Sequence, residues 1–79
     1  MGKEQHEVIT LWTLEGCPYC EKVKRKLHEK GLDYREIVIE RSNKPEEVRS
    51  TGGTVPVIRV NEKLISDSSR ICDYLDENY

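Results

Sequence analysis

Residues 15–27 read EGCPYCEKVKRKL, a stretch that places two cysteines at the start of a basic segment. Its apolar positions recur at three- and four-residue steps, which is typical of one face of a helix. These positions are Cys20, Val23 and Leu27. Pro18 suits a first helical turn, where no amide donor is needed, and Gly31 suits a C-terminal cap. The pattern therefore predicts a helix over residues 18–30.

Apolar runs on both sides of this helix predict β-strands. Residues 8–12 are mainly β-branched and aromatic, and residues 34–39 form a second run of strand length. The IVI sequence inside the second run predicts burial on both faces, as in a parallel sheet. Farther along, residues 55–60 and 63–65 read as short strands, which the residues NEK join in a tight hairpin turn.

Two more helices complete the predicted order. A short helix runs through KPEEVRS at 44–50, capped by Ser42 or Asn43, and the residues TGG end it. The last helix is capped by Asp67 or Ser66. Its apolar stripe consists of Ile71, Tyr74 and Leu75. The order β-α-β-α-β-β-α predicts an α/β fold with a four-stranded mixed sheet, parallel in its N-terminal half and flanked by helices.

Length and charge favour one small soluble domain. A chain of 79 residues is one domain at most, and we expect it over 8–79, after a flexible lead at 1–7. The 13 basic residues nearly balance the 15 acidic ones, so the net charge does not favour binding to nucleic acid or anionic lipid. The apolar runs are shorter than the ~20 residues of a membrane span. We therefore expect a monomer with no nucleic-acid or membrane partner.

The cysteine count bears on the redox compartment. Three cysteines are too few, and too odd in number, for a disulfide framework, and no apolar signal segment precedes them. We therefore expect a cytoplasmic location, where reducing conditions prevail. In that compartment a close cysteine pair is more often reactive or metal-bound than structural.

The spacing of Cys17 and Cys20 divides the chemistry between them. Cys17 precedes the predicted helix, where free amides and the positive end of the helix dipole stabilise a thiolate. Cys20 lies one turn inside on the same face, so it can reach the Cys17 sulfur in a mixed disulfide. We therefore expect Cys17 to attack a disulfide and Cys20 to resolve the intermediate.

Two other interpretations of the pair are weaker. A zinc site takes four ligands, and the further candidates His6, His28 and Cys72 are poorly spaced for that role, so we expect no metal. A structural disulfide across one helical turn closes almost no loop and stabilises little. Cys72, within the last helix, is most simply a small core residue.

The motifs CPYC at 17–20, TVP at 54–56 and SDSSRI at 66–71 resemble those of the glutaredoxins and of the related N-terminal domain of glutathione transferases. The resemblance covers residues 8–79. It implies a thioredoxin fold and glutathione-dependent thiol-disulfide exchange, with Cys17 as nucleophile and Cys20 as resolving thiol. Glutathione would be a co-substrate, no cofactor would be tightly bound, and the partners would be disulfide-containing or glutathionylated proteins.

The same resemblance implies a set of glutathione-binding residues. They are Tyr19, Val55, Pro56, Asp67 and Ser68. A cis Val55-Pro56 bond would expose the Val55 amide and carbonyl to the glutathione backbone, as an added strand would. At the start of the last helix, amides and the Ser68 hydroxyl would hold the α-carboxylate while Asp67 pairs with the α-ammonium. The alternative is that Asp67 only caps the helix.

The chain departs from the glutaredoxin pattern at two points. Leu14 stands where many glutaredoxins have a lysine, and Lys22, Arg41 or Arg49 are the candidates to replace it. The glycine pair that commonly precedes the acidic residue is also absent, with LISDSS in its place. Both departures favour the transferase-like branch of the family.

Three functions remain open from the sequence. The first is a dithiol oxidoreductase that uses glutathione to reduce protein disulfides and glutathione mixed disulfides. The second keeps this exchange but takes its electrons from a thioredoxin-type reductase or another small thiol. The third is a non-enzymatic iron-sulfur carrier with a cluster bridging two copies through Cys17, which the bulky Pro18 and Tyr19 disfavour.

Overall fold

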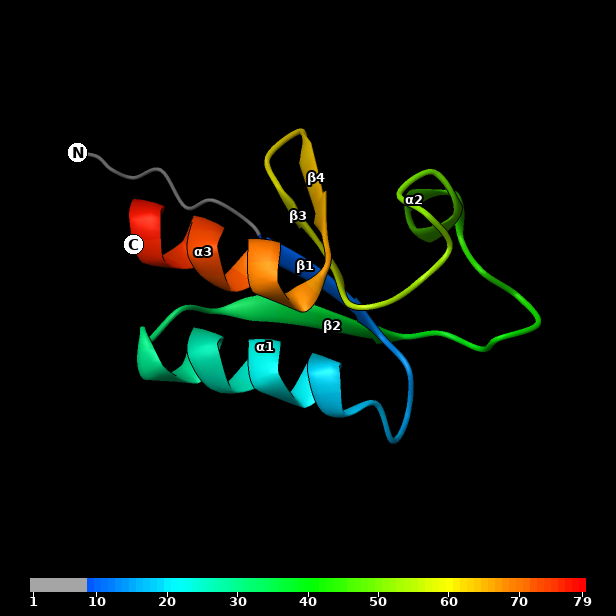
Figure 1. The fold of residues 1–79 in the computed structure, drawn as a ribbon, viewed down its shortest axis with the longest axis horizontal. Coiled ribbons are helices and arrows are strands. Elements are labelled where there is room, and N and C mark those ends of the chain that lie inside the picture. Colours follow the sequence, from blue (N-terminus) through cyan, green and yellow to red (C-terminus); the bar gives the residue numbers. More distant parts are fainter. Residues whose placement is uncertain (1–8) are drawn as a thin grey trace.

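Four strands form one mixed sheet in the computed structural model, which describes residues 9–79 (Figure 1). The strands are β1 (Ile9–Thr13), β2 (Tyr34–Val38), β3 (Val57–Val60) and β4 (Lys63–Ser66). Their spatial order is β2-β1-β3-β4; β1 and β2 are parallel, and the other two pairs are antiparallel. The predicted thioredoxin fold is confirmed, whereas Val8 and the lead at 1–7 lie outside the described residues.

The helices are divided between the two faces of the sheet. The long helices α1 (Pro18–Glu29) and α3 (Ser68–Asn78) lie side by side on one face, and both begin at the same end of the sheet (Figure 1). The short helix α2 (Glu46–Arg49) contributes Val48 to a cluster with Trp12 on the opposite face. Within residues 9–79, none of the helices has the length and apolar character needed to cross a membrane.

The main core lies between the sheet and the two long helices. Inward-facing residues of β1 and β3 pack there against one side of α1 and α3. The cluster consists of Ile9, Leu11, Val23, Leu27, Ile58, Val60, Ile71 and Leu75. Cys72 is also buried, which confirms that it is a core residue. Because α1 is held by Val23 and Leu27, its N-terminal end is fixed relative to the sheet.

Both ends of α1 follow the predicted chemistry. Cys17 is the N-cap residue, and the helix ends at Glu29, one residue earlier than predicted. Gly31 has a φ of 68°, a conformation that favours glycine. Beyond it, the Leu32 amide donates to the Leu27 carbonyl at 3.0 Å, which satisfies a carbonyl of the last turn.

The hairpin of β3 and β4 is confirmed, with shifted limits. The strands begin at Val57 and Lys63, and a tight turn at Asn61, which has a φ of 58°, connects them. Residues 55 and 56 precede β3 instead of forming its start. They therefore lie in a loop at the end of the sheet where α1 and α3 begin.

The prediction that β2 is buried on both faces was wrong. Ile37 is 38% exposed and Val38 is 59% exposed. The reason is topological, because β2 is the edge strand of the sheet and pairs with β1 alone. Only Ile39, just beyond the strand, reaches the small core around Trp12. A β-branched run therefore indicated a strand here without indicating where in the sheet it lies.

The predicted N-cap of α2 was also wrong. Pro45 occupies that position and no side chain caps the helix. Asn43 instead forms a turn, in which its amide donates to the Glu40 carbonyl at 3.0 Å. The predicted end of the helix is confirmed, because the Gly53 amide donates to the Val48 carbonyl at 2.9 Å.

Candidate functional site

Cys17 and Cys20 lie in different environments at the start of α1. Cys17 has an extended backbone with φ of −89° and ψ of 113°, and its sulfur accepts a hydrogen bond from the Cys20 amide at 3.4 Å. Cys17 is partly exposed, whereas Cys20 is 1% exposed, and both are free thiols. The accessible sulfur is thus the one at the helix N-terminus, which suits the predicted division of roles.

The environment of Cys20 keeps it protonated. Burial raises the pKa of Cys20 to about 12, and the hydrogen bond with Cys17 and the charge of Cys17 act in the same direction. A backbone hydrogen bond from Leu14 and the charge of Lys24 lower it in part. Cys20 is therefore a thiol in the neutral range, and its reactivity depends on what happens at Cys17.

All five predicted glutathione-binding residues line one pocket of about 390 Å³. The pocket is lined by Tyr19, Thr54, Val55, Pro56, Ser66, Asp67, Ser68 and Ser69. Three segments supply these residues: the first turn of α1, the loop before β3, and the junction between the end of β4 and the start of α3. Cys17 lies two residues before Tyr19 and is not among the lining residues. The five predicted residues therefore lie around one pocket, and their role in binding glutathione stays a prediction.

Val55 has unpaired backbone groups beside this pocket. The Val55-Pro56 bond is cis, as the resemblance implied. Within residues 9–79 neither the amide nor the carbonyl of Val55 makes a hydrogen bond to another backbone group. Buried or half-buried backbone groups are usually paired, so these two are available to an extended peptide that lies in the pocket.

Asp67 caps α3 and also lines the pocket. The Asp67 carboxylate accepts a hydrogen bond from the Ser69 amide at 2.9 Å, so Asp67 does cap the helix. However, Asp67 has a φ of 77°, which costs about 1–3 kcal/mol for a residue other than glycine and recurs at ligand sites. A helix cap does not need that conformation. The strained backbone favours a second role for Asp67.

Ser68 presents an unused hydroxyl to the same pocket. It is 7% exposed, and its hydroxyl makes no hydrogen bond with another residue of the described segment. Buried hydroxyl groups normally have partners. Together with the amides at the start of α3, this hydroxyl can therefore hold a carboxylate that enters the pocket.

A second pocket of about 270 Å³ adjoins the first, and the two share Thr54 and Val55. Its lining consists of Leu14, Ile39, Arg41, Lys44, Val48, Gly53, Thr54 and Val55. Of the three predicted replacements for the glutaredoxin lysine, Arg41 lies here, whereas Lys22 and Arg49 line neither pocket.

Lys44 is a pocket residue that sequence reasoning missed. Its Nζ donates to the Gly53 carbonyl at 2.7 Å, which fixes the ammonium beside Val55. The only available signal was a cation in the segment between β2 and α2. Its approach to Val55 depends on how that loop folds, which local sequence does not determine.

The histidine and cysteine groups give no metal centre in the described segment. Among residues 9–79, no three His, Cys, Asp or Glu side chains are grouped so that they could hold a metal ion. Nε2 of His28 lies 3.2 Å from the Tyr34 hydroxyl, in a hydrogen bond between α1 and β2. His6 lies outside the described residues.

A comparison with known families identifies the family of the fold. The model of the glutathione S-transferase N-terminal domain matches residues 11–79. This chain belongs to that family. The match confirms the resemblance stated from the CPYC, TVP and SDSSRI motifs, and it agrees with the transferase-like branch that the departures at Leu14 and before Asp67 favour.

This glutathione S-transferase N-terminal domain is similar in sequence to proteins named as a hybrid peroxiredoxin and a glutaredoxin. It is 37% identical over 75 residues to hybrid peroxiredoxin hyPrx5 of Haemophilus influenzae, covering 89% of the chain and 31% of that relative. It is 32% identical over 78 residues to glutaredoxin 1 of Rickettsia conorii, covering 92% of the chain and 76% of that relative. The chain thus spans under a third of the first relative and most of the second.

A solved structure agrees with the fold. The dehydroascorbate reductase of Chlamydomonas reinhardtii matches this domain with a TM-score of 0.82 at 27% identity. The match covers 95% of the chain and 40% of that structure. The four-stranded sheet with its helices is therefore the N-terminal domain architecture of this family.

Proposed function

We propose that this domain is a glutathione-dependent dithiol oxidoreductase that reduces protein disulfides and glutathione mixed disulfides. One observation carries the proposal: a partly exposed Cys17 at a helix N-terminus, with buried Cys20 one turn away, lies two residues before Tyr19, and Tyr19 lines one pocket with every other predicted glutathione-binding residue. The similarity to proteins named glutaredoxin and hybrid peroxiredoxin supports thiol chemistry of this general kind.

The exchange takes place in two thiol transfers. The Cys17 thiolate attacks the glutathione sulfur of a mixed disulfide, a Cys17-glutathione bond forms, and the substrate leaves as a thiolate that takes up a proton. A second glutathione thiolate then attacks the bound glutathione sulfur. This step releases oxidised glutathione and restores the Cys17 thiolate. With a protein disulfide, Cys20 performs the second attack instead, and the resulting Cys17-Cys20 disulfide is reduced by two glutathione molecules.

The two adjoining pockets suit the two charged ends of glutathione. The γ-glutamyl end carries an α-carboxylate and an α-ammonium, which match the Ser68 hydroxyl, the α3 amides and the Asp67 carboxylate. The central peptide can pair with the free amide and carbonyl of Val55. The glycyl carboxylate would then point to the second pocket, where Arg41 and Lys44 supply positive charge in place of the usual lysine at Leu14.

Turnover of a glutathione mixed disulfide with glutathione as the only reductant tests this function. We expect multiple turnovers, followed through a coupled glutathione reductase. The same assay with a thioredoxin-type reductase, or with another small thiol, measures the alternative reductants. Turnover with one of these and none with glutathione would reject the glutathione-dependent assignment while keeping the thiol exchange.

Anaerobic purification tests the iron-sulfur alternative. We expect a colourless protein, because Pro18 and Tyr19 stand between the two cysteines where cluster carriers have smaller neighbours. A brown protein with visible absorbance that is lost in Cys17→Ser would instead favour the carrier function.

A further inference from the structure

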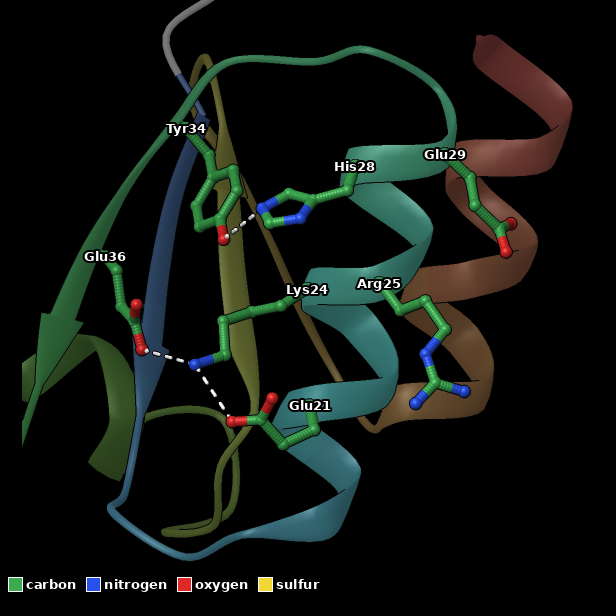
Figure 2. A pocket seen from close by; sticks show the side chains of 7 residues that line it. All are labelled: Glu21, Lys24, Arg25, His28, Glu29, Tyr34 and Glu36. Carbon is green, nitrogen blue, oxygen red and sulfur yellow. Dashed lines mark hydrogen bonds and ion pairs between the residues drawn. The ribbon is translucent and has the colours of Figure 1, made fainter.

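A polar groove of about 660 Å³ separates α1 from the edge strand β2 (Figure 2). It is lined by Glu21, Lys24, Arg25, His28, Glu29, Tyr34 and Glu36. Figure 2 shows that Lys24 and His28 reach from α1 toward β2, whereas Arg25 and Glu29 point away from it. Helix α1, which follows Cys17 and contains Cys20, is therefore connected to the edge strand by polar groups.

Lys24 is the central group of this connection. Its Nζ lies 3.0 Å from Glu21 Oε2 and 3.2 Å from Glu36 Oε2. Glu36 is itself held by Thr13, whose hydroxyl donates to the same Oε2 at 2.8 Å and whose side chain is almost fully buried. Two carboxylates from different elements thus hold the ammonium in place, and one of them is anchored to the central strand.

The position of Lys24 along α1 relates it to the resolving thiol. Lys24 follows Cys20 by four residues, so the two side chains are neighbours on one face of the helix. Its charge acts on the Cys20 thiol in the direction that favours the thiolate. Hydrogen bonds to Glu21 and then Glu36 raise the pKa of Lys24, so the ammonium keeps its charge throughout the neutral range.

We propose that Lys24, held between Glu21 and Glu36, is a positioning residue for the resolving step, in which it favours the Cys20 thiolate once Cys17 is bound in a mixed disulfide. The inference rests on the proposed dithiol function. In the reduced enzyme, burial first, and then the hydrogen bond and charge of Cys17, raise the pKa of Cys20. Formation of the mixed disulfide removes the negative charge of Cys17. Lys24 is then the charged side chain that acts on Cys20.

The step itself balances without another reactant. Cys20 gives up its proton, and its thiolate attacks Sγ of Cys17 in the mixed disulfide. The bond between Cys17 and the substrate sulfur breaks, the Cys17-Cys20 disulfide forms, and the substrate thiolate takes up a proton. In this step the Cys20 sulfur is oxidised and the second sulfur of the substrate is reduced, while the Cys17 sulfur stays in a disulfide.

A chromogenic aromatic disulfide, dithiobis(nitrobenzoate), separates the two attacks in one rapid-mixing trace. Attack by Cys17 releases one coloured thiolate in a phase that depends on reagent concentration. Attack by Cys20 releases the second in a first-order phase, which Cys20→Ser should abolish. The ratio of the second rate to the first isolates the resolving step, and it does not involve glutathione.

We expect this ratio to fall about threefold in Lys24→Met, because loss of the ammonium lowers the fraction of Cys20 present as thiolate and the higher nucleophilicity of the more basic thiolate offsets only part of that loss. Lys24→Arg keeps the charge and should restore the ratio. Arg25→Met is the matched control, because it removes one positive charge from the next residue, which points away from β2 (Figure 2).

The pH dependence separates charge from packing. The groups facing Lys24 are Glu21 and Cys20 on its own helix and Glu36, Tyr34 and the Thr13 hydroxyl from the sheet. Burial raises the pKa of both Cys20 and Tyr34, so both change charge in the alkaline part of the profile, but of the two only Cys20 attacks the mixed disulfide in the second phase. The alkaline acceleration of that phase should move to higher pH in Lys24→Met and stay in place in Lys24→Arg.

The outcomes test the role of Lys24, the dithiol mechanism and the choice of reductant separately. An unchanged ratio in Lys24→Met, an equal loss in Lys24→Arg, or an equal loss in Arg25→Met would overturn the role of Lys24. A wild-type trace without any second phase would instead reject the dithiol mechanism. A second phase combined with no turnover by glutathione would reject only the choice of reductant.

Discussion

The backbone amide of Cys20 donates a hydrogen bond to the sulfur of Cys17 across 3.4 Å. A thiolate accepts such a bond more strongly than a thiol does, and the helix dipole acts in the same direction. Cys20 receives no comparable help from the helix end, because it lies one turn inside and is buried. We therefore expect two cysteines three residues apart to differ in reactivity in the reduced domain.

This inequality predicts different effects of replacing each cysteine. Cys17→Ser should abolish turnover of a glutathione mixed disulfide, because serine supplies no sulfur nucleophile. Cys20→Ser should retain that turnover and lose the reduction of protein disulfides. Cys72→Ala, a change on the buried side of α3, is the control and should retain both activities. Appreciable turnover in Cys17→Ser would contradict the assignment of the nucleophile.

Asp67→Asn separates ligand binding from helix capping. Asparagine caps a helix about as well as aspartate and tolerates a positive φ, so the free energy of unfolding should change little. Loss of the charge should raise KM for glutathione about fivefold, which corresponds to ~1 kcal/mol for a solvent-exposed charged hydrogen bond. Asp73→Asn on the exposed side of α3 is the matched control. An unchanged KM in Asp67→Asn would leave Asp67 with the capping role alone.

The second pocket predicts a cationic contact with the glycyl carboxylate. Arg41→Met and Lys44→Met should each raise KM for glutathione several-fold, on the order of ~1 kcal/mol per charged contact, while kcat changes less. Arg49→Met is the control, because Arg49 pairs with Glu46 on the surface of α2 and lines neither pocket. Steady-state kinetics at varied glutathione concentration measure the effect. Equal KM values in all three variants would place the carboxylate elsewhere.

The contact between Thr13 and Glu36 predicts a loss of stability in acid. The hydrogen bond from Thr13 first, and then the bond and charge of Lys24, lower the pKa of the Glu36 carboxyl in the folded state. A lowered folded pKa contributes stability above the ordinary carboxyl pKa, and this contribution is lost as pH falls through the folded value. Urea unfolding of wild type and Glu36→Gln should therefore differ most near neutral pH. The difference should shrink toward about pH 3, and a constant difference would contradict it.

Much of the fold was predictable because its signals are local. The three- and four-residue steps at Cys20, Val23 and Leu27, together with Pro18 and Gly31, are sufficient to place α1. The edge position of β2 was not predictable. β-branched residues indicate that a segment is a strand, but its burial depends on which strands and helices become its neighbours. The cap of α2 was missed for a related reason, since the turn at Asn43 competes with its capping role.

In the candidate site, too, some residues were predictable from sequence and others depend on how the chain folds. Cys17 and Cys20 lie on one helix, so their spacing alone predicts their geometry, and the family resemblance placed Asp67 and Val55. Lys44 and Lys24 were not found from sequence. Their neighbours Gly53 and Glu36 are 9 and 12 residues away, and side-chain contacts at that separation depend on the folded loops and the strand register.

Parallel helix dipoles that lie side by side repel each other, and α1 and α3 begin at the same end of the sheet (Figure 1). A negative charge at each start relieves this repulsion. Asp67 lies at the start of α3 and Glu21 in the first turn of α1, and a Cys17 thiolate would add a further negative charge to α1 in the reduced state. In the proposed Cys17-Cys20 disulfide that added charge would be absent. Because whatever stabilises the dithiol form makes the disulfide the stronger oxidant, the helix arrangement would then shift the proposed redox couple toward accepting electrons.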